Sequence, residues 1–397
     1  MLRRNFISHF AVPWLLRARA ASGVEKGGLF PSGGRQFVLG LYNLPKVPDP
    51  WREASEAGCN LVHVAPSLED FDRAREHHLH TWVSLGSISE KNRTADESRI
   101  RGIVEQFRGD SALLFWETED EPAFTWKSLK PRVSPERIIA THDFVRGIDP
   151  SHPLYLNHAP LNLESTLRKY NGGAEIIATD IYPVIPPGIR EMYALWPTGR
   201  QGDFLNATIS QVGEYTDKMR GVAGPDRTVF MVLQAFAWED LRDKDRNPAM
   251  VLYPDRTQLK SMAYQAIIHG ADGLLYWGLA SNPPATPVWN DLRAVLSELA
   301  QIAPELAGPP QELTLPIEYH DTGHSLDRGI EWTARPSGKG LMLFTVNADL
   351  NPVEGRFSLP AGLGSCQMVG SNETIPVSRG TVELSYDPFE AKALRIR

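Results

Sequence analysis

Residues 115–122 read Phe-Trp-Glu-Thr-Glu-Asp-Glu-Pro, and this stretch decides how the rest of the chain is interpreted. A short apolar run, Ala112 to Trp116, is followed at once by four acids within five residues and then by Pro122. This order predicts a buried strand that emerges at the rim of a sheet or barrel. Proline has no N–H to donate, so regular strand pairing should stop near it. The acids are therefore expected at the carboxyl end of the strand, where α/β folds place their chemistry.

Side chains alternate along a strand, so Glu117, Glu119 and Glu121 would share one side if the strand continued, with Asp120 on the other. The alternative is a solvated acidic loop. Aromatic residues flank the cluster at positions 115, 116, 124 and 126, and they favour a site over a loop.

The bulk composition is that of a soluble globular protein. The chain has 397 residues, 42% hydrophobic and 22% charged, which is enough for one large domain and a small one. A net charge of −7 argues against nucleic-acid binding, which needs clustered basic residues. Only Cys59 and Cys366 are present, far apart, and both are expected to be free thiols. No run after the N-terminus approaches the roughly 20 apolar residues of a membrane-spanning helix.

The first 20 residues have the features of a leader. Paired arginines at positions 3 and 4 precede Asn5-Phe6-Ile7, a modest apolar stretch reaches Leu16, and Ala18-Arg19-Ala20 fits a small-x-small cleavage site. The start resembles a twin-arginine export signal, which implies a periplasmic or extracellular protein. The alternative is an irregular soluble N-terminus.

Strands and helices then alternate up to about residue 308. Eight apolar segments are predicted to be strands, at 36–42, 59–64, 80–85, 113–116, 154–157, 176–182, 229–236 and 273–277. Helical patterns lie between them, among them 136–146, 204–219 and 259–269, and a helix at 292–306 follows. About 33 residues per unit and near-continuous apolar strands favour a (β/α)8 TIM barrel over residues 21–308. A doubly wound open sheet is the alternative, but no Gly-x-Gly-x-x-Gly follows the first strand.

After Gly308-Pro309-Pro310 the pattern changes to short strands separated by turn residues. The predicted strands are 329–334, 340–347, 355–359, 381–385 and 391–396. We expect a small antiparallel β-sandwich domain over residues 309–397, which supports the barrel.

Asp120-Glu121-Pro122 at the end of the fourth strand resembles the Asn-Glu-Pro that supplies the general acid/base in clan-A glycoside hydrolases. Three other stretches are similar to less-studied relatives of that group: Asp180-Ile181-Tyr182-Pro183, Gln234-Ala235-Phe236, and residues 270–277, Gly-Ala-Asp-Gly-Leu-Leu-Tyr-Trp. Asp387-Pro388-Phe389-Glu390 fits the sandwich domains of such enzymes. The resemblance covers nearly all of the chain after the leader.

Two positions depart from the clan pattern. Asp120 stands where the clan has Asn, which replaces a hydrogen-bond donor with an acceptor. Gln234 stands where the clan has its nucleophilic Glu, at the end of strand seven, and a neutral amide cannot form a stable glycosyl ester. Either the register differs, another acid serves, or the protein binds sugar without the usual retaining chemistry.

Glycoside cleavage usually takes two carboxyl groups, one protonated and one ionised. Crowded carboxylates beside apolar walls raise the pKa of at least one, so Glu121 is predicted to be the general acid. Asp180, then Glu239 and then Glu119 are candidates for the second carboxylate, and Asp180 could instead cap its loop. The predicted sugar-binding residues are Glu119, Asp120, Asn157, Tyr182, Gln234, Trp238 and Trp277. Asp272 precedes its strand, so it is predicted to be structural.

The sequence thus predicts an exported glycosidase that acts on an oligo- or polysaccharide. The alternative from another class is a non-catalytic glycan-binding barrel, which Gln234 favours. The histidines are scattered and strand one has none, so no metal is expected, and no cofactor is implied. The sugar, the linkage and the oligomeric state do not follow from the residues.

Overall fold

The protein is described by a computed structural model that covers residues 36–125, 130–186, 208–242, 244–284, 286–319, 328–371 and 373–397. The predicted leader at 1–20 lies outside these residues, as do Trp126 and the first part of the helix predicted at 204–219. No helix in the described part of the chain is both long and apolar enough to span a membrane.

Eight parallel strands close into a barrel in the order β1 to β8, which confirms the predicted fold class. The closure is made by β1 and β8, where Val38 pairs with Gly273 and Leu41 with Tyr276. The strands are β1 (Val38–Leu41), β2 (Leu61–His63), β3 (His80–Ser84), β4 (Leu113–Glu117), β5 (Leu154–His158), β6 (Ile176–Ile181), β7 (Thr228–Gln234) and β8 (Gly273–Trp277). Each lies within two residues of its predicted ends, because a strand buried on both faces is a continuous apolar run in the sequence.

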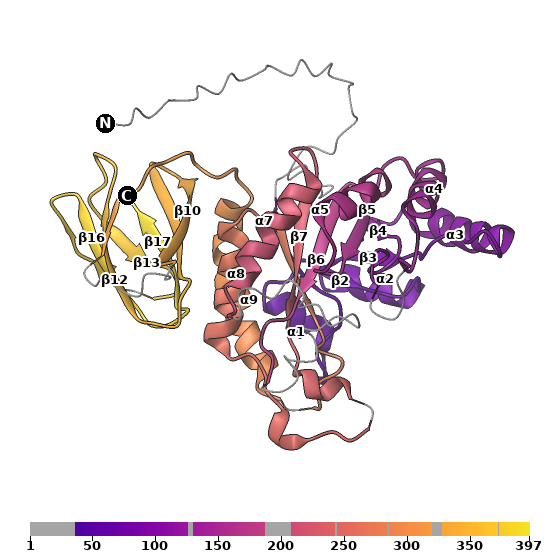
Figure 1. Ribbon diagram of the computed structural model, residues 1–397, viewed down its shortest axis with the longest axis horizontal. Coiled ribbons are helices and arrows are strands. Elements are labelled where there is room, and N and C mark those ends of the chain that lie inside the picture. Colours follow the sequence, from indigo (N-terminus) through magenta and orange to yellow (C-terminus); the bar gives the residue numbers. More distant parts are fainter. Residues whose placement is uncertain are drawn as a thin grey trace, which may run out of the picture.

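Helices surround this barrel (Figure 1). They are α1 (Pro50–Glu56), α2 (Leu68–Glu76), α3 (Arg93–Phe107), α4 (Pro135–Arg146), α5 (Glu164–Leu167), α7 (Gln211–Ala223), α8 (Arg256–Ile268) and α9 (Val288–Leu306), with short 3₁₀ turns η1 (Arg168–Gly173), η2 (Trp238–Leu241) and η3 (Pro248–Met250). Local sequence sets their starts. Ser134 accepts from the Arg137 N–H at the start of α4, and Asp255 with Gln258 forms a capping box at the start of α8.

The barrel interior is filled by side chains, as in other closed eight-stranded barrels. At Gly273 no side chain would fit, since an added Cβ would lie 2.7 Å from the Cβ of Val38. The interior residues are Val38, Leu61, Trp82, Leu114, Phe115, Tyr155, Ile176, Ala178, Phe230, Val232 and Leu275, with Tyr42, Tyr182 and Trp277 packed against them.

The C-terminal part forms two antiparallel sheets, in the orders β10-β11-β17-β13-β14 and β15-β16-β12-β9. The strands are β9 (Ile317–Tyr319), β10 (Ile330–Ser337), β11 (Gly340–Asn347), β12 (Val353–Ser358), β13 (Cys366–Met368), β14 (Thr374–Ile375), β15 (Val377–Ser378), β16 (Thr381–Tyr386) and β17 (Ala391–Ile396). Of these, β9, β13, β14 and β15 were not predicted, because two- and three-residue strands leave no periodic pattern. Cys59 and Cys366 are buried free thiols, as predicted.

The first sheet packs on the barrel through the outer face of β11 and β17. Met342, Phe344 and Val346 of β11 belong to the same apolar core as the barrel helices, and the Phe344 and Tyr264 rings lie 6.2 Å apart. In Figure 1 the sandwich lies beside α8 and α9, at the end of the molecule opposite α3 and α4.

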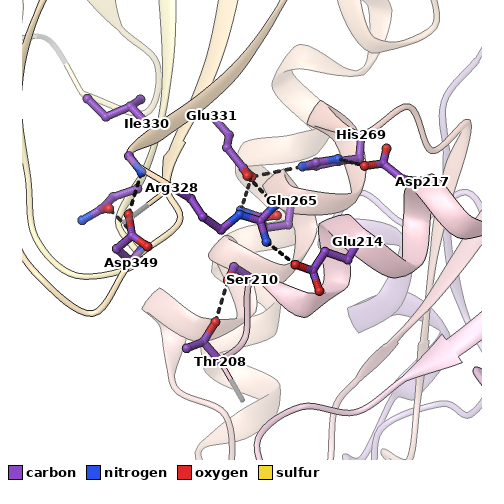
Figure 2. Close-up of polar contacts among 12 residues, drawn as sticks. Thr208, Ser210, Glu214, Asp217, Gln265, His269, Arg328, Ile330, Glu331 and Asp349 are labelled. Atoms are coloured by element: carbon purple, nitrogen blue, oxygen red, sulfur yellow. Dashed lines mark hydrogen bonds and ion pairs between the residues drawn. The ribbon is translucent and has the colours of Figure 1, made fainter. Parts of the chain in front are cut away.

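A polar network joins the two domains at the edge of this interface (Figure 2). His269 bonds to Asp217 at 2.9 Å and to Glu331 of β10 at 3.0 Å. Arg328 joins Glu331 at 2.6 Å and Glu214 of α7 at 2.8 Å. These partners outweigh burial and raise the pKa of His269 to about 9, so its imidazolium is held between two carboxylates.

Candidate active site

Strand β4 ends at Glu117, which lies on the floor of the barrel mouth. Its carboxylate is 2% exposed and accepts hydrogen bonds from Trp82 Nε1 at 3.1 Å, Ser84 Oγ at 2.5 Å and Tyr42 Oη at 3.3 Å. Burial raises the pKa of Glu117 to about 7, with a further upward contribution from the charge of Asp120. The expectation that Glu117, Glu119 and Glu121 would share one side does not apply, because regular pairing stops at Glu117.

Further polar side chains lie around Glu117, none of them among the predicted site residues. The hydroxyls of Tyr42 and Tyr155 are 2.7 Å apart, and His63 Nε2 lies 3.0 Å from Ser84 Oγ. Burial lowers the pKa of His63 to about 4, so the imidazole is neutral. Strand alternation in the sequence could have predicted this floor of the mouth. Phe115 faces inward, and Glu117, two residues later on the same strand, must also face inward.

Glu121 lies past the end of β4 in a turn, with a backbone φ of +45°. Its N–H donates to the Asn157 carbonyl at 3.0 Å, which holds the turn against β5. A left-handed conformation is strained for a residue with a side chain, and such strain is found most often where a side chain must be aimed. Burial, and then the charge of Asp120, raise the pKa of Glu121 to about 7, while Arg132 at 3.8 Å opposes the rise.

The carboxyl groups of Glu121 and of Asp180, at the end of β6, lie close enough for each to influence the pKa of the other. Asp180 is 8% exposed, and its pKa is raised well above the usual range by burial first and then by the charges of Glu121 and Asp120. Two carboxyl groups buried this close together resist carrying a negative charge at the same time. At neutral pH the pair therefore holds a proton, which is what a general acid requires.

Asn157 at the end of β5 connects Asp180 to the third acid of the mouth. Its Nδ2 lies 3.0 Å from Asp120 Oδ1 and 3.3 Å from Asp180 Oδ1. The Asn157 Oδ1 atom is buried and has no hydrogen-bond partner among the described residues. Asp120 is exposed, yet the surrounding walls raise the pKa of its carboxyl. The mouth thus offers several acceptors to a ligand that carries hydroxyl groups.

Aromatic rings line the β6–β8 side of the mouth. Tyr182 and Trp277 are stacked, with centroids 5.6 Å apart and planes 25° apart. Phe236 meets Trp277 edge-on at 5.0 Å, and Trp238 donates from Nε1 to the Tyr182 carbonyl at 3.2 Å. Tyr182, Trp238 and Trp277, which the sequence predicted as sugar-binding residues, are each partly exposed, so flat apolar faces lie beside the acids.

Three of the predicted residues are engaged elsewhere. Gln234 is fully buried: its Oε1 accepts from Val184 N–H at 2.8 Å and its Nε2 donates to the Val184 and Phe236 carbonyls. Glu239 is 1% exposed and holds its own loop through the Asn247 N–H and Arg242. Gln234 was predicted to bind sugar and Glu239 to be a catalytic carboxylate, and neither side chain is available for these roles. The cause is the same, since both lie beside irregular backbone whose N–H and C=O groups need hydrogen-bond partners. Glu119 accepts from Ser87 Oγ at 2.6 Å on the rim.

Gln234 does end β7, where it pairs with Trp277, so a shifted register does not explain the missing glutamate. Asp272 has the structural role predicted for it, because its carboxylate accepts from the Val229 N–H at 2.9 Å and pairs with Arg220 at 3.1 Å.

No family model matches the chain, and no curated protein matches it by sequence. Solved structures do match in fold. A glycoside hydrolase family 5 protein from Bacteroides vulgatus has a TM-score of 0.62 at 11% identity, covering 94% of this chain and 93% of its own. A family 42 β-galactosidase from G. stearothermophilus has a TM-score of 0.54 at 9% identity, covering 91% of this chain and 98% of its own. AmyP, solved with maltotriose, has a TM-score of 0.55 at 11% identity, covering 87% and 89%. The chain therefore shares its barrel-and-sandwich architecture with glycoside hydrolases.

Proposed function

We propose that this protein is a glycoside hydrolase in which Glu121 is the general acid. The observation that carries the proposal is the pair of interacting carboxyl groups, Glu121 and Asp180, at the barrel mouth; both pKa values are raised, so the pair holds a proton at neutral pH beside partly exposed aromatic faces. An oligo- or polysaccharide is the substrate class, since acids with free acceptor positions suit hydroxyl groups and the rings suit the apolar faces of sugars. The sugar complexes of fold neighbours, such as AmyP with maltotriose, agree with this class.

Asp180 works with Glu121 as one unit in this proposal. Carboxyl groups that flank a scissile glycosidic bond stand about 5–5.5 Å apart in retaining enzymes and about 6.5–9.5 Å apart in inverting ones. The pKa values of Glu121 and Asp180 are both raised, so the pair shares one proton at neutral pH, and we assign Asp180 to the proton donor rather than to the second carboxylate of either arrangement. Asp120, exposed and oriented by Asn157, is the carboxylate best placed to meet a water molecule.

The test is release of reducing sugar from a broad oligosaccharide panel by the wild type, Glu121→Gln and Asp120→Asn. Glu105→Gln, on the exposed face of α3, is the matched control. We expect turnover to fall by at least about 100-fold in Glu121→Gln, the usual effect of losing a general acid, and to stay unchanged in the control. Full turnover by a folded Glu121→Gln protein would overturn the assignment.

A glycan-binding protein without catalysis is the second candidate. It is favoured by the β7–β8 side of the mouth, where Gln234 replaces a carboxylate and the partly exposed groups are aromatic. Saturable binding of oligosaccharides, with no release by the wild type, would support this candidate over hydrolysis.

Export through a twin-arginine-like leader at residues 1–20 is also a proposal. Fractionation of cells that express the full chain, beside a variant with Arg3 and Arg4 changed to Lys, tests it. Retention of only the variant in the cytoplasm is the expected result.

A further inference from the structure

A cavity of about 460 Å³ lies between the barrel and the sandwich. Its wall on the barrel side is the end of α8, residues 268–270, together with Asp217 of α7. Its wall on the sandwich side is β10, residues 330–333, with Arg335. Because α8 ends just before β8 begins, this cavity lies toward the face of the barrel opposite the mouth, and it is separate from the proposed active site.

Arg335 is the unusual member of this wall. The residue is only 4% exposed, yet its guanidinium forms hydrogen bonds through one nitrogen alone, from Nη1 to Thr333 Oγ1 at 2.9 Å and to the Ala334 carbonyl at 3.3 Å. Its Nε is buried and has no partner among the described residues. Burial lowers the pKa of Arg335 to about 10, and the charge of Asp272 only partly opposes this. A buried cation without a direct counter-ion is rare, since burial costs its hydration.

The acids nearby are already engaged. Asp217 and Glu331 hold the imidazolium of His269 between them, and Glu331 also pairs with Arg328 (Figure 2). Asp272 is bonded to Arg220 and to the Val229 N–H. Among the described residues of this part of the interface, each of these three carboxylates could neutralise Arg335 only by breaking another contact.

We propose that this cavity binds a small oxyanion, a carboxylate or a phosphate, through the guanidinium of Arg335. Guanidinium recognises such groups through N–H donors in a fixed plane. Arg335 lines this cavity, and part of its guanidinium makes no bond with the described residues. His269 lines the same cavity as an imidazolium, between the carboxylates of Asp217 and Glu331. The volume is larger than a free phosphate needs, so the anionic group can be carried on a sugar acid or a sugar phosphate. Its hydroxyl groups would then meet the carboxylates of Asp217 and Glu331.

The proposal is independent of catalysis and is tested by binding. The full chain is titrated by calorimetry with sodium phosphate, sodium glucuronate and glucose at constant ionic strength. Three variants accompany it: Arg335→Met removes the charge but keeps the apolar stem, Arg335→Lys keeps the charge, and Arg356→Met is the matched control. Arg356 lies on β12 of the same sandwich, with a 40% exposed side chain paired to Glu383.

We expect saturable binding of at least one of the two anions to the wild type and to Arg356→Met, and none of glucose. Arg335→Met should bind at least tenfold more weakly, and Arg335→Lys should lie between. Preference for glucuronate over phosphate would identify a carboxylate source, and the reverse a phosphate source. Absence of saturable anion binding to the wild type, or equal binding by a cooperatively folded Arg335→Met protein, would overturn the proposal. If Arg335→Met does not fold, a crystal of the wild type grown in phosphate decides: density against the guanidinium supports the site, and its absence rejects it.

Discussion

The carboxyl groups of Glu121 and Asp180 interact at the barrel mouth, although Glu121 follows strand β4 and Asp180 lies on β6, with β5 between them. Asn157 of β5 closes the arrangement by bonding to Asp180 at 3.3 Å and to Asp120 at 3.0 Å. Three neighbouring strands thus place their terminal polar side chains at one point, which concentrates acid chemistry in the mouth of the barrel.

The pH dependence of turnover should follow Glu121. Its raised pKa, about 7, means that the proton donor is present below that pH and is lost as the pH rises through it. Asp120 raises this pKa and Arg132 lowers it, so the two neighbours allow opposite tests. We expect Asp120→Asn to move the alkaline limb of the pH–rate profile to lower pH and Arg132→Gln to move it to higher pH. If the alkaline limb shifted in the same direction in both variants, its pKa would belong to a group other than Glu121.

Replacing Gln234 with Glu should weaken the fold rather than restore a nucleophile. The amide donates to the Val184 and Phe236 carbonyls in a fully buried position, and a carboxylate there would face two acceptors. We expect Gln234→Glu to lower the free energy of unfolding by about 3 kcal/mol at pH 7, measured in urea. The loss should be smaller at pH 5, where the buried carboxyl can be neutral. A variant as stable as the wild type, or one with increased turnover, would contradict this role for Gln234.

Trp277 should contribute to saccharide binding through its exposed face. We expect Trp277→Ala to raise KM about tenfold with a smaller effect on kcat, since a stacking ring binds substrate and transition state alike. Trp277→Phe should retain much of the affinity because it keeps a flat ring against Tyr182. Circular dichroism of each variant checks that changing the ring stacked on Tyr182 has not disrupted the fold. An unchanged KM in Trp277→Ala would place the sugar elsewhere.

The contact between the domains should weaken in alkali. The pKa of His269 is raised to about 9 in the folded state from an ordinary value near 6.5, so its contribution is complete below about pH 6.5 and is lost as the pH rises through 9. Glu331 has a lowered pKa, so its contribution is lost instead as the pH falls through the acid range. We expect His269→Gln to reduce the thermal midpoint at pH 6, and the difference from wild type to vanish by about pH 10. A constant difference across this range would show that the imidazolium is not what His269 supplies.

The barrel, the sandwich and the rim on which the acids stand could all be predicted from the amino-acid sequence. Strands buried on both faces must be apolar throughout, so each strand, such as Gly273–Trp277, can be recognised as an apolar run in the sequence. Pro122 indicates where the pairing of β4 ends. The sequence also pointed to Glu121, Asp180 and Asn157, because each follows or ends a strand at the carboxyl side.

The bonding partners of these polar side chains, in contrast, depend on the tertiary structure. Gln234 and Glu239 have the same kind of position in the sequence as Asp180, yet backbone groups of neighbouring loops take up their polar atoms. Tyr42 and Glu117 meet although 75 residues separate them, and Arg335 is buried against helices of another domain. Strand position follows from local hydrophobicity, whereas the partner of a polar group depends on which distant segments approach it, and this is set only when the chain closes.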